Sequence, residues 1–259
     1  MNILLTGGSS LLAKSLIDKL LRSGHNIYVI SRKKKYLNKN VKTVNLNLSK
    51  TIEKPKLVKL LKPIKINFDC LFHFAFCVIN KTQIDNDFLF KKNIQITENI
   101  VEISKLISLK KFINISSQSV YYDLYSNNLN KKTRCKEYYY SLSNICAENI
   151  INIKLKKNIK QIVHLRLSNV FTYSIYGRGI INELFKELKK KNSMTIYNKN
   201  RRLLFISINH LLDKLINYLN NNKKNGSYDL KQTDMNIVDF ATFLKKNYGN
   251  SETIIRYKK

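Results

Sequence analysis

The sequence predicts an α/β fold built on an open, doubly wound parallel sheet. Between residues 2 and 167, short apolar segments alternate with stretches of helical periodicity, and the apolar segments are too hydrophobic to expose one face to water. Such alternation is typical of βαβ units, whose parallel strands are covered by helices on both faces. Ligands of such sheets bind beyond the carboxyl ends of the strands, so the residues that follow each strand are the candidates for function.

The elements of this first part follow from local patterns. The longest expected helix has apolar residues that recur three and four positions apart, among them Ile96, Ile100 and Ile103. Gly24 is well placed to end the first helix, because glycine tolerates the left-handed backbone that often follows a helix. Strands are expected at 3–5, 27–31, 41–46, 68–76, 111–117 and 161–167, and helices at 10–23, 54–61, 87–109 and 138–155.

The texture of the sequence changes after residue 177. Helices are expected there at 180–191, 210–220 and 236–247, and strands at 194–197, 203–207 and 227–230, before an extended end. No repeat or low-complexity linker separates this part from the first. We therefore predict a first domain at 1–167 and a small lobe at 168–259 packed on it.

The charge of the chain is strongly basic, with 47 Lys and Arg against 17 Asp and Glu and a formal net charge of +30. Such a charge could indicate nucleic acid or a membrane surface as partner. The lysines are scattered among abundant Asn and Ile rather than gathered in an Arg-rich stripe with interleaved aromatic residues. Since Lys, Asn and Ile share A/T-rich codons, a biased genome is the simpler explanation, and we expect no nucleic acid and no membrane as partner.

The cysteines and the N-terminus bear on the compartment. Cys70, Cys77, Cys135 and Cys146 form no CxxC pair and have no histidine partners at zinc spacing, so we expect reduced thiols and no metal site. The apolar N-terminus lacks a basic segment and is interrupted by small residues at 7–10, unlike a signal peptide. The sequence contains no uncharged run of 18 or more apolar residues, so it predicts no membrane span. We expect a cytoplasmic protein.

The first strand leads into a turn of small residues, Thr6 to Ser10, and directly into a helical pattern. A strand, a tight turn and a helix start in this order are typical of a dinucleotide-binding βαβ unit, because the helix N-terminus offers unpaired N–H groups to a pyrophosphate. By itself this signal is weak, since any βα turn can be rich in Gly and Ser.

Six further segments stand in register behind this turn. The seven are TGGSSLLA at 6–13, HFA at 73–75, FINISSQSVY at 112–121, YSLSNICAE at 140–148, LRLSNVF at 165–171, FISIN at 205–209 and GSYDL at 226–230. In this order they resemble extended short-chain dehydrogenase/reductases of the NAD-dependent epimerase/dehydratase type, which modify nucleotide sugars. The resemblance implies a Rossmann-type sheet with a small C-terminal substrate-side lobe, a nucleotide-sugar substrate, and a homodimer built from the helices at 87–109 and 138–155.

The resemblance also implies a catalytic set of Ser117, Tyr140 and the residue four positions after the tyrosine. In the family Tyr is the acid/base in hydride transfer at a sugar carbon, Ser hydrogen-bonds the same oxygen, and a Lys supports both. A free phenol has a pKa of about 10, and a nearby ammonium favours the phenolate. Position 144 is Asn, which carries no charge. Either catalysis persists in weakened form, or the chain is a catalytically impaired relative with a sensor or structural role.

The resemblance places the cofactor at the carboxyl ends of the strands. Ser10 and Ala13 stand where the family has its second and third glycines, and their small side chains still permit a close backbone approach. The implied cofactor-binding residues are Gly7, Ser9, Ser10, Leu11, Leu12, Ser31, Arg32, Asn47, Leu48, Phe74, Ala75, Asn93, Asn169 and Val170.

The residues after the second strand bear on the choice of cofactor. A residue that hydrogen-bonds the ribose 2′-hydroxyl of NAD would be Asp or Glu. Here Ser31 and Arg32 follow the strand and precede three lysines. Because arginine offers a fork to a 2′-phosphate, we predict NADP, with NAD possible; the alternative is a solvated basic loop. Asn47 replaces the family's Asp beside the adenine, which keeps an acceptor and loses a charge.

Histidines and arginines complete the candidate residues. His73 and His164 lie in apolar strands without metal-spaced partners, and we interpret them as structural. A nucleotide-sugar diphosphate needs cations, for which Arg166 and Arg202 are the candidates. Another solvated pair in a basic chain is the alternative.

Overall fold

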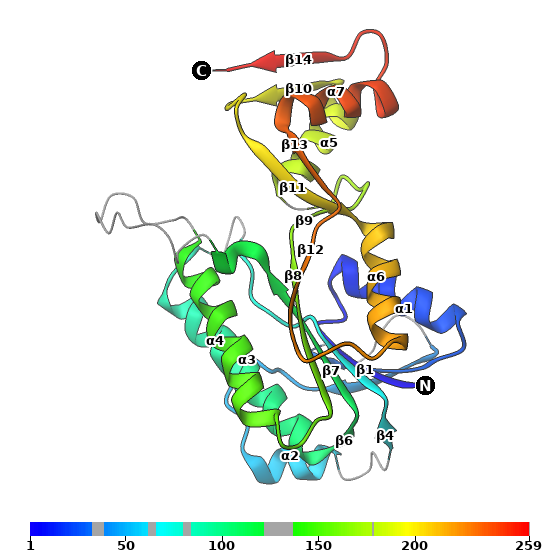
Figure 1. The fold of residues 1–259 in the computed structure, drawn as a ribbon, viewed down its shortest axis with the longest axis vertical. Helices are drawn as coiled ribbons and strands as arrows, with labels where there is room; N and C mark the ends of the chain where they lie inside the picture. Colours follow the sequence, from blue (N-terminus) through cyan, green and yellow to red (C-terminus); the bar gives the residue numbers. More distant parts are fainter. Residues whose placement is uncertain (33–38, 62–65, 80–83, 122–136, 178, 259) are drawn as a thin grey trace. The chain divides into compact units, whose positions relative to one another are not determined.

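The structure is a computed structural model that describes residues 1–32, 39–61, 66–79, 84–121, 137–177 and 179–258 (Figure 1). The chain forms two compact units. The first unit comprises Met1–Arg166 and Asn221–Tyr228, and the second comprises Leu167–Asn220 and Asp229–Lys259. Residues 221–228 thus return to the first unit after the chain has built most of the second.

The first unit contains a seven-stranded sheet in the order β12-β8-β7-β5-β1-β2-β3. Its strands are β1 (Asn2–Thr6), β2 (Asn26–Ser31), β3 (Val41–Asn45), β5 (Cys70–His73), β7 (Lys111–Ser117), β8 (Gln161–Leu167) and β12 (Gly226–Leu230). β1 lies between β2 and β5 and runs parallel to both, and the crossovers reverse direction there. The predicted doubly wound parallel sheet is confirmed.

Among the described residues of the first unit, four helices and a short 3₁₀ turn accompany this sheet. They are α1 (Leu11–Arg22), α2 (Lys54–Leu61), α3 (Asp87–Leu106), η1 (Gln118–Tyr121) and α4 (Tyr138–Leu155). α3 ends three residues earlier than predicted, because β6 (Ser108–Leu109) pairs with β4 (Asn67–Phe68) instead of continuing the helix. Gly24 ends α1 with a positive φ of 74°, as predicted, and its N–H donates to the Leu21 carbonyl.

On one of its two faces, the sheet changes from apolar to polar toward the carboxyl ends of its strands. Leu4, Leu71 and Phe112 lie side by side on neighbouring strands and belong to one apolar cluster, which also contains residues of α3 and α4. Two residues further along, the row consists of Thr6, His73 and Asn114. Polar side chains are therefore buried directly below the edge where a ligand of this fold binds.

The second unit has its own apolar core. Its helices are α5 (Ile180–Lys191), α6 (Ile208–Asn220) and α7 (Ile237–Tyr248), and its strands are β9 (Asn169–Phe171), β10 (Ser193–Ile196), β11 (Arg202–Ser207), β13 (Thr233–Asn236) and β14 (Ile254–Tyr257). β11 pairs with β9 and β13, and β10 pairs with β14. Phe171, Phe185 and Phe240 are buried together at the centre of this core.

The position of β12 differs from the sequence interpretation, which grouped residues 227–230 with the small lobe. The strand forms the edge of the large sheet, next to β8. Its burial alternates along the strand, as expected at a sheet edge with one covered face. Nothing in the local sequence indicates which strand it pairs with, because its partner lies more than 60 residues earlier.

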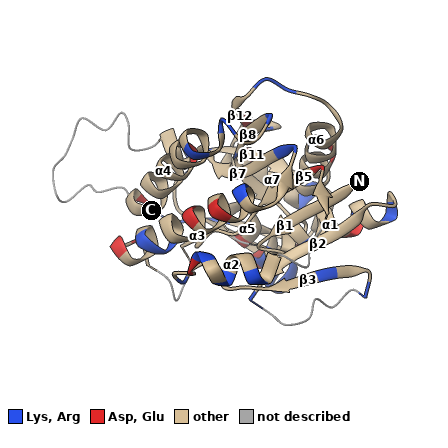
Figure 2. Ribbon diagram, turned by 90° about the horizontal axis from the view of Figure 1, so that it is seen from below, with Lys and Arg blue, Asp and Glu red and all other residues tan. Residues whose placement is uncertain are grey.

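The basic residues, the hydropathy of the helices and the cysteines can each be located in the structure. Figure 2 shows Lys and Arg on many elements rather than along a single stripe. Among the residues that the structure describes, no helix is long and apolar enough to span a membrane. Cys70, Cys77 and Cys146 are free thiols, and Cys135 lies outside the described residues.

Candidate active site

The turn after β1 makes a very close contact with the residues after β5. Gly7 has a φ of +68°, and a Cβ there would lie 2.7 Å from the Ala75 nitrogen and 2.7 Å from the Phe74 carbonyl carbon. The Thr6 hydroxyl accepts a hydrogen bond from the Ala75 N–H at 3.1 Å and bonds the His73 Nδ1 at 2.8 Å. The ends of β1 and β5 are thus held together, and only glycine fits at position 7.

The N-terminus of α1 follows directly from this turn. Ser10 is the N-cap, and its hydroxyl accepts the Ala13 N–H at 3.2 Å. Helix geometry leaves the N–H groups of Leu11 and Leu12 without partners inside the helix. Since Ser9, Ser10 and Leu11 are exposed, these donors and the positive end of the helix dipole are open to an anion.

The loop after β3 is fixed from two sides. The Asn47 Oδ1 accepts from the Ser49 N–H at 3.1 Å and from the Ser49 hydroxyl at 2.8 Å. The Asn99 amide on α3 donates to the Leu48 and Lys50 carbonyls, both at 2.8 Å. Because both lone pairs of the Asn47 oxygen are engaged, this side chain can offer a base only its amide N–H groups.

Two other predicted cofactor residues lie at the end of β2: Ser31 is its last residue, and Arg32 follows it. The Ser31 carbonyl accepts from the Leu46 N–H at 2.9 Å, which continues the pairing of β2 with the chain after β3. Arg32 is exposed at the carboxyl edge of the sheet. The three lysines that follow it lie outside the described residues.

Asn93 has a structural position inside the first unit. It is fully buried on α3, where its Oδ1 accepts the Cys77 N–H at 2.7 Å. Its Nδ2 donates to the Cys77 carbonyl at 3.1 Å and to the Ser143 hydroxyl at 3.0 Å. The side chain therefore joins the segment after β5 to both α3 and α4, and its contact with a cofactor stays a prediction.

The three predicted catalytic residues lie together. Ser117 is the last residue of β7, and Tyr140 lies in the first turn of α4. Burial raises the pKa of Tyr140, while hydrogen bonds from the Asn144 and Ser117 side chains lower it by less, so the pKa lies above its usual value of 10. The Asn144 Nδ2 also donates to the Tyr140 carbonyl at 2.9 Å. Tyr140 is therefore a protonated phenol at neutral pH.

The start of α4 is capped by Asp85, which sequence reasoning did not identify. Its carboxylate accepts from the Tyr139 N–H at 2.9 Å and from the Tyr140 N–H at 2.8 Å. The neighbouring Asn86 caps α3 in the usual local way, through the Leu89 N–H. A cap from Asp85 to a helix more than fifty residues later leaves no local signal in the sequence.

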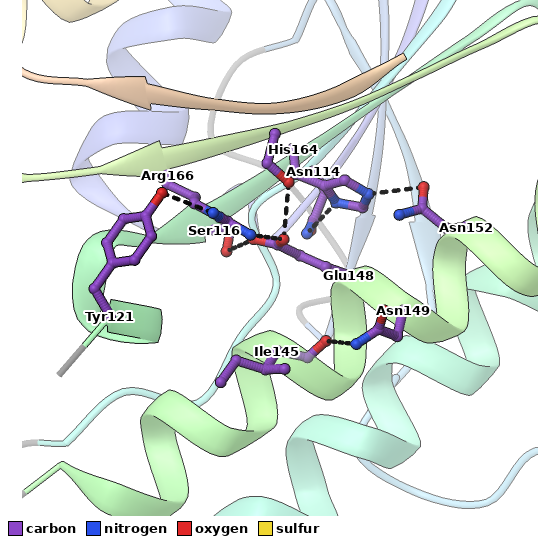
Figure 3. Close-up of polar contacts among 10 residues, drawn as sticks. Asn114, Ser116, Tyr121, Ile145, Glu148, Asn149, Asn152, His164 and Arg166 are labelled. Atoms are coloured by element: carbon purple, nitrogen blue, oxygen red, sulfur yellow. Dashed lines mark hydrogen bonds and ion pairs between the residues drawn. The ribbon is translucent and has the colours of Figure 1, made fainter. Parts of the chain in front are cut away.

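The buried Glu148 on α4 and the half-buried Arg166 on β8 form an ion pair (Figure 3). The Arg166 Nε donates to Oε1 at 3.0 Å and its Nη2 to Oε2 at 2.7 Å. The Arg166 Nη1 donates to the Tyr121 hydroxyl at 2.7 Å. The sequence interpretation offered Arg166 to a substrate diphosphate, but in the structure its guanidinium is engaged within the protein.

Both histidines of the sheet are buried and neutral. Burial lowers the pKa of His73 to about 3 and that of His164 to about 4. His164 lies between the amides of Asn114 and Asn152, at 3.1 and 3.0 Å (Figure 3). Among the described residues, no group of three or more His, Cys, Asp or Glu could hold a metal ion. These positions fit the structural role that the sequence indicates.

The remaining predicted residues lie in the second unit. Asn169 and Val170 are in β9, where the Asn169 amide donates to the Leu204 carbonyl at 3.0 Å and the Val170 carbonyl accepts from Asn182 at 2.7 Å. Arg202, the other candidate for a diphosphate, pairs with Asp234 at 3.0 Å on the surface.

Comparisons with solved structures agree with this fold. UDP-N-acetylglucosamine 4-epimerase from Bacillus cereus superposes with a TM-score of 0.78 at 18% identity, over 100% of this chain and 89% of that one. UDP-glucose 4-epimerase from Thermotoga maritima, solved with UDP-glucose, gives 0.78 at 16% identity, over 100% and 86%. UDP-glucuronic acid 4-epimerase from Bacillus cereus, solved with UDP-glucuronic acid and NAD, gives 0.76 at 23% identity, over 100% and 86%.

At these identities the solved structures establish the fold alone. A search of curated proteins finds no match. The family assignment comes from a family model, which matches residues 3–229 and so includes the turn at Gly7, the Ser117–Tyr140 pair and most of β12. The chain belongs to the NAD dependent epimerase/dehydratase family.

Proposed function

We propose that the chain binds a nicotinamide dinucleotide at the Gly7 turn and acts by hydride transfer on a nucleotide-activated sugar. The observation that carries the proposal is the hydrogen-bonded set of Ser117 and Tyr140, in the same unit as the turn. The residues at the turn fit a dinucleotide, because Gly7 lets the ends of β1 and β5 approach each other closely and α1 offers free N–H groups beside them. The second unit is the substrate-binding lobe in this proposal.

The chemistry of the chain's own residues favours one direction. A bound nicotinamide supplies or accepts the hydride. Tyr140, protonated at neutral pH, is ready to donate its proton to the oxygen of a sugar carbonyl, and the Ser117 hydroxyl hydrogen-bonds that oxygen. Oxidation of a sugar hydroxyl needs the phenolate instead, which the raised pKa of Tyr140 makes scarce at neutral pH.

The substrates of the solved relatives support a UDP-sugar as the first choice. We place the activity in the cytoplasmic synthesis of a surface polysaccharide, and a homodimer through α3 and α4 is part of the same proposal. The second candidate is a catalytically impaired NAD(P)-binding relative with a sensor or structural role. Asn144 favours it, because no cation stands beside Tyr140 at that position.

The test compares the parent with Tyr140→Phe. Binding of NADPH and NADH is followed by nicotinamide fluorescence, and turnover is then measured on a panel of UDP-sugars. We expect Tyr140→Phe to keep cofactor affinity within about twofold and to lower turnover by about 10²- to 10⁴-fold, the usual contribution of a general acid/base. Cofactor binding without turnover in the parent supports the second candidate, and no cofactor binding contradicts both.

The choice of cofactor is tested at Arg32. We propose NADP because Arg32 is exposed after β2, where a guanidinium could pair with the 2′-phosphate. Arg32→Ser is expected to weaken NADPH binding by roughly tenfold or more and to leave NADH binding unchanged. Arg22→Ser, which removes an exposed arginine from the far end of α1, is the control and should change neither. Tighter binding of NADH than NADPH by the parent contradicts the proposal.

A further inference from the structure

The last two residues of β7 contact α4 at two separate points. Ser117 hydrogen-bonds Tyr140 in the first turn of the helix. Its neighbour Ser116 donates to the Glu148 Oε1 at 2.6 Å (Figure 3). Tyr140 and Glu148 are eight residues apart on one helix, which corresponds to about 12 Å along its axis. Together the two contacts restrict how α4 can rotate or slide against the end of β7.

The carboxylate of Glu148 is held from several elements at once. Oε1 accepts from Ser116 and from the Arg166 Nε, while Oε2 accepts from the Arg166 Nη2 and from the Ser227 hydroxyl at 2.9 Å. A carboxylate has about four lone-pair directions, so four donors saturate it. Glu148 is 5% exposed. It is therefore a fixed anchor on α4 rather than a group that could take up a proton from a ligand.

We propose that Glu148 is a positioning residue: through Ser116 it holds the end of β7 against α4 and thereby sets the hydrogen bond between Ser117 and Tyr140. Its effect on turnover rests on the proposed function, but its effect on the hydrogen bond does not. Misplacement by about 1 Å at a reacting group can lower a rate by 10²-fold, so a contact one residue from Ser117 matters for catalysis.

The two serines on Glu148 provide a matched pair of variants. Ser116 and Ser227 each donate one hydrogen bond to the same carboxylate, but only Ser116 is next to Ser117. Ser116→Ala removes the link between β7 and α4, whereas Ser227→Ala removes a comparable bond from β12. If the loss of any hydrogen bond to Glu148 is what matters, Ser116→Ala and Ser227→Ala should affect Tyr140 equally. Positioning of Ser117 predicts an effect of Ser116→Ala alone.

The readout is the ionisation of Tyr140, which needs no substrate. 3-Fluorotyrosine is placed at position 140 in the full chain, and its ¹⁹F shift is titrated with pH in the parent and in each variant. Because the Ser117 hydrogen bond lowers the pKa of Tyr140, its loss in Ser116→Ala should raise that pKa by about 0.5 to 1. Ser227→Ala should leave it unchanged.

Two further variants separate positioning from charge. Glu148→Gln keeps an oxygen that can accept from Ser116, so the Tyr140 titration should stay close to the parent, whereas Glu148→Leu should reproduce Ser116→Ala. Removal of a negative charge by itself would lower the pKa of Tyr140, the opposite sign. If Glu148→Leu does not fold, Ser116→Ala still decides, since it removes one hydroxyl. In a Ser117→Ala background, Ser116→Ala should have no further effect.

Turnover gives a separate result. Ser116→Ala is expected to lower kcat by about 10-fold or more while KM and the affinity for NADPH change by less than about twofold. No change in the Tyr140 titration of Ser116→Ala, or equal changes in the two serine variants, overturns the inference. A selective change of the titration in a chain that turns over no sugar upholds the inference and counts against the proposed function alone.

Discussion

Replacing Asn144 with lysine is expected to raise turnover of a UDP-sugar at pH 7 by about 10²-fold, the lower end of what general acid/base catalysis contributes. The reason is the pKa of Tyr140, which in the parent is raised mainly by burial and lowered by less through the hydrogen bonds from Asn144 and Ser117. An ammonium at position 144 favours the phenolate and lowers that pKa. In the parent the rate of sugar oxidation should rise with pH toward values above 10, and in Asn144→Lys the rise should move to lower pH.

Two controls accompany this change. Asn144→Gln lengthens the side chain without adding charge and should give no gain. Asn149→Lys adds the same charge to an exposed position of α4 and should also give none. Initial rates between pH 6 and 10, with saturating cofactor, measure all four proteins. Equal gains in Asn144→Lys and Asn144→Gln, or an unchanged pH profile in a lysine variant that still binds cofactor, contradict the explanation from charge.

Replacing Gly7 with alanine should abolish detectable cofactor binding and lower the free energy of unfolding by more than about 2 kcal/mol. Two causes add here. The left-handed backbone costs a residue with a Cβ about 1 to 2 kcal/mol. In addition, the new Cβ would lie 2.7 Å from the backbone of Phe74 and Ala75, so the ends of β1 and β5 must move apart.

Gly24 provides the control for this experiment. Its φ of +74° is close to that of Gly7, but a Cβ at Gly24 would meet nothing within 4 Å. Gly24→Ala should therefore lower the free energy of unfolding only by the cost of the left-handed backbone, about 1 to 2 kcal/mol, and should keep cofactor binding. Urea denaturation and NADPH fluorescence measure both variants. If both variants lose the same free energy of unfolding, the close contact at Gly7 contributes nothing to stability.

Periodicity predicted most elements of this chain because their patterns are local. The bounds of α2, α4, β7 and β8 agree with the sequence interpretation to the residue, and each pattern can be read from adjacent positions. Contacts between distant residues could not be read in this way. β12 joins the large sheet beside a strand far earlier in the chain, and Asp85 caps a helix that starts at Tyr138.

In the candidate site too, local motifs could be predicted from the sequence and contacts between distant residues could not. The motif predicts Ser117, Tyr140 and Asn144 as a group, and the structure places them in contact. The partner of Arg166 could not be predicted, because a basic residue near a strand end suits a ligand phosphate and a buried carboxylate equally well. Arg166 pairs with Glu148 because α4 packs on β8, and this packing cannot be read from the sequence near Arg166.

The capped start of α4 has a consequence for the electrostatic potential at the phenol. Tyr140 lies in the first helical turn, where the positive end of the helix dipole would favour a phenolate. Asp85 accepts the first N–H groups there and places a negative charge at that end, and Glu137 raises the pKa of Tyr140 further. Among the described residues, the hydrogen bonds from Asn144 and Ser117 are thus what lowers the pKa of this phenol. Added salt, which screens the negative charge of Glu137, is therefore expected to lower the pKa of Tyr140.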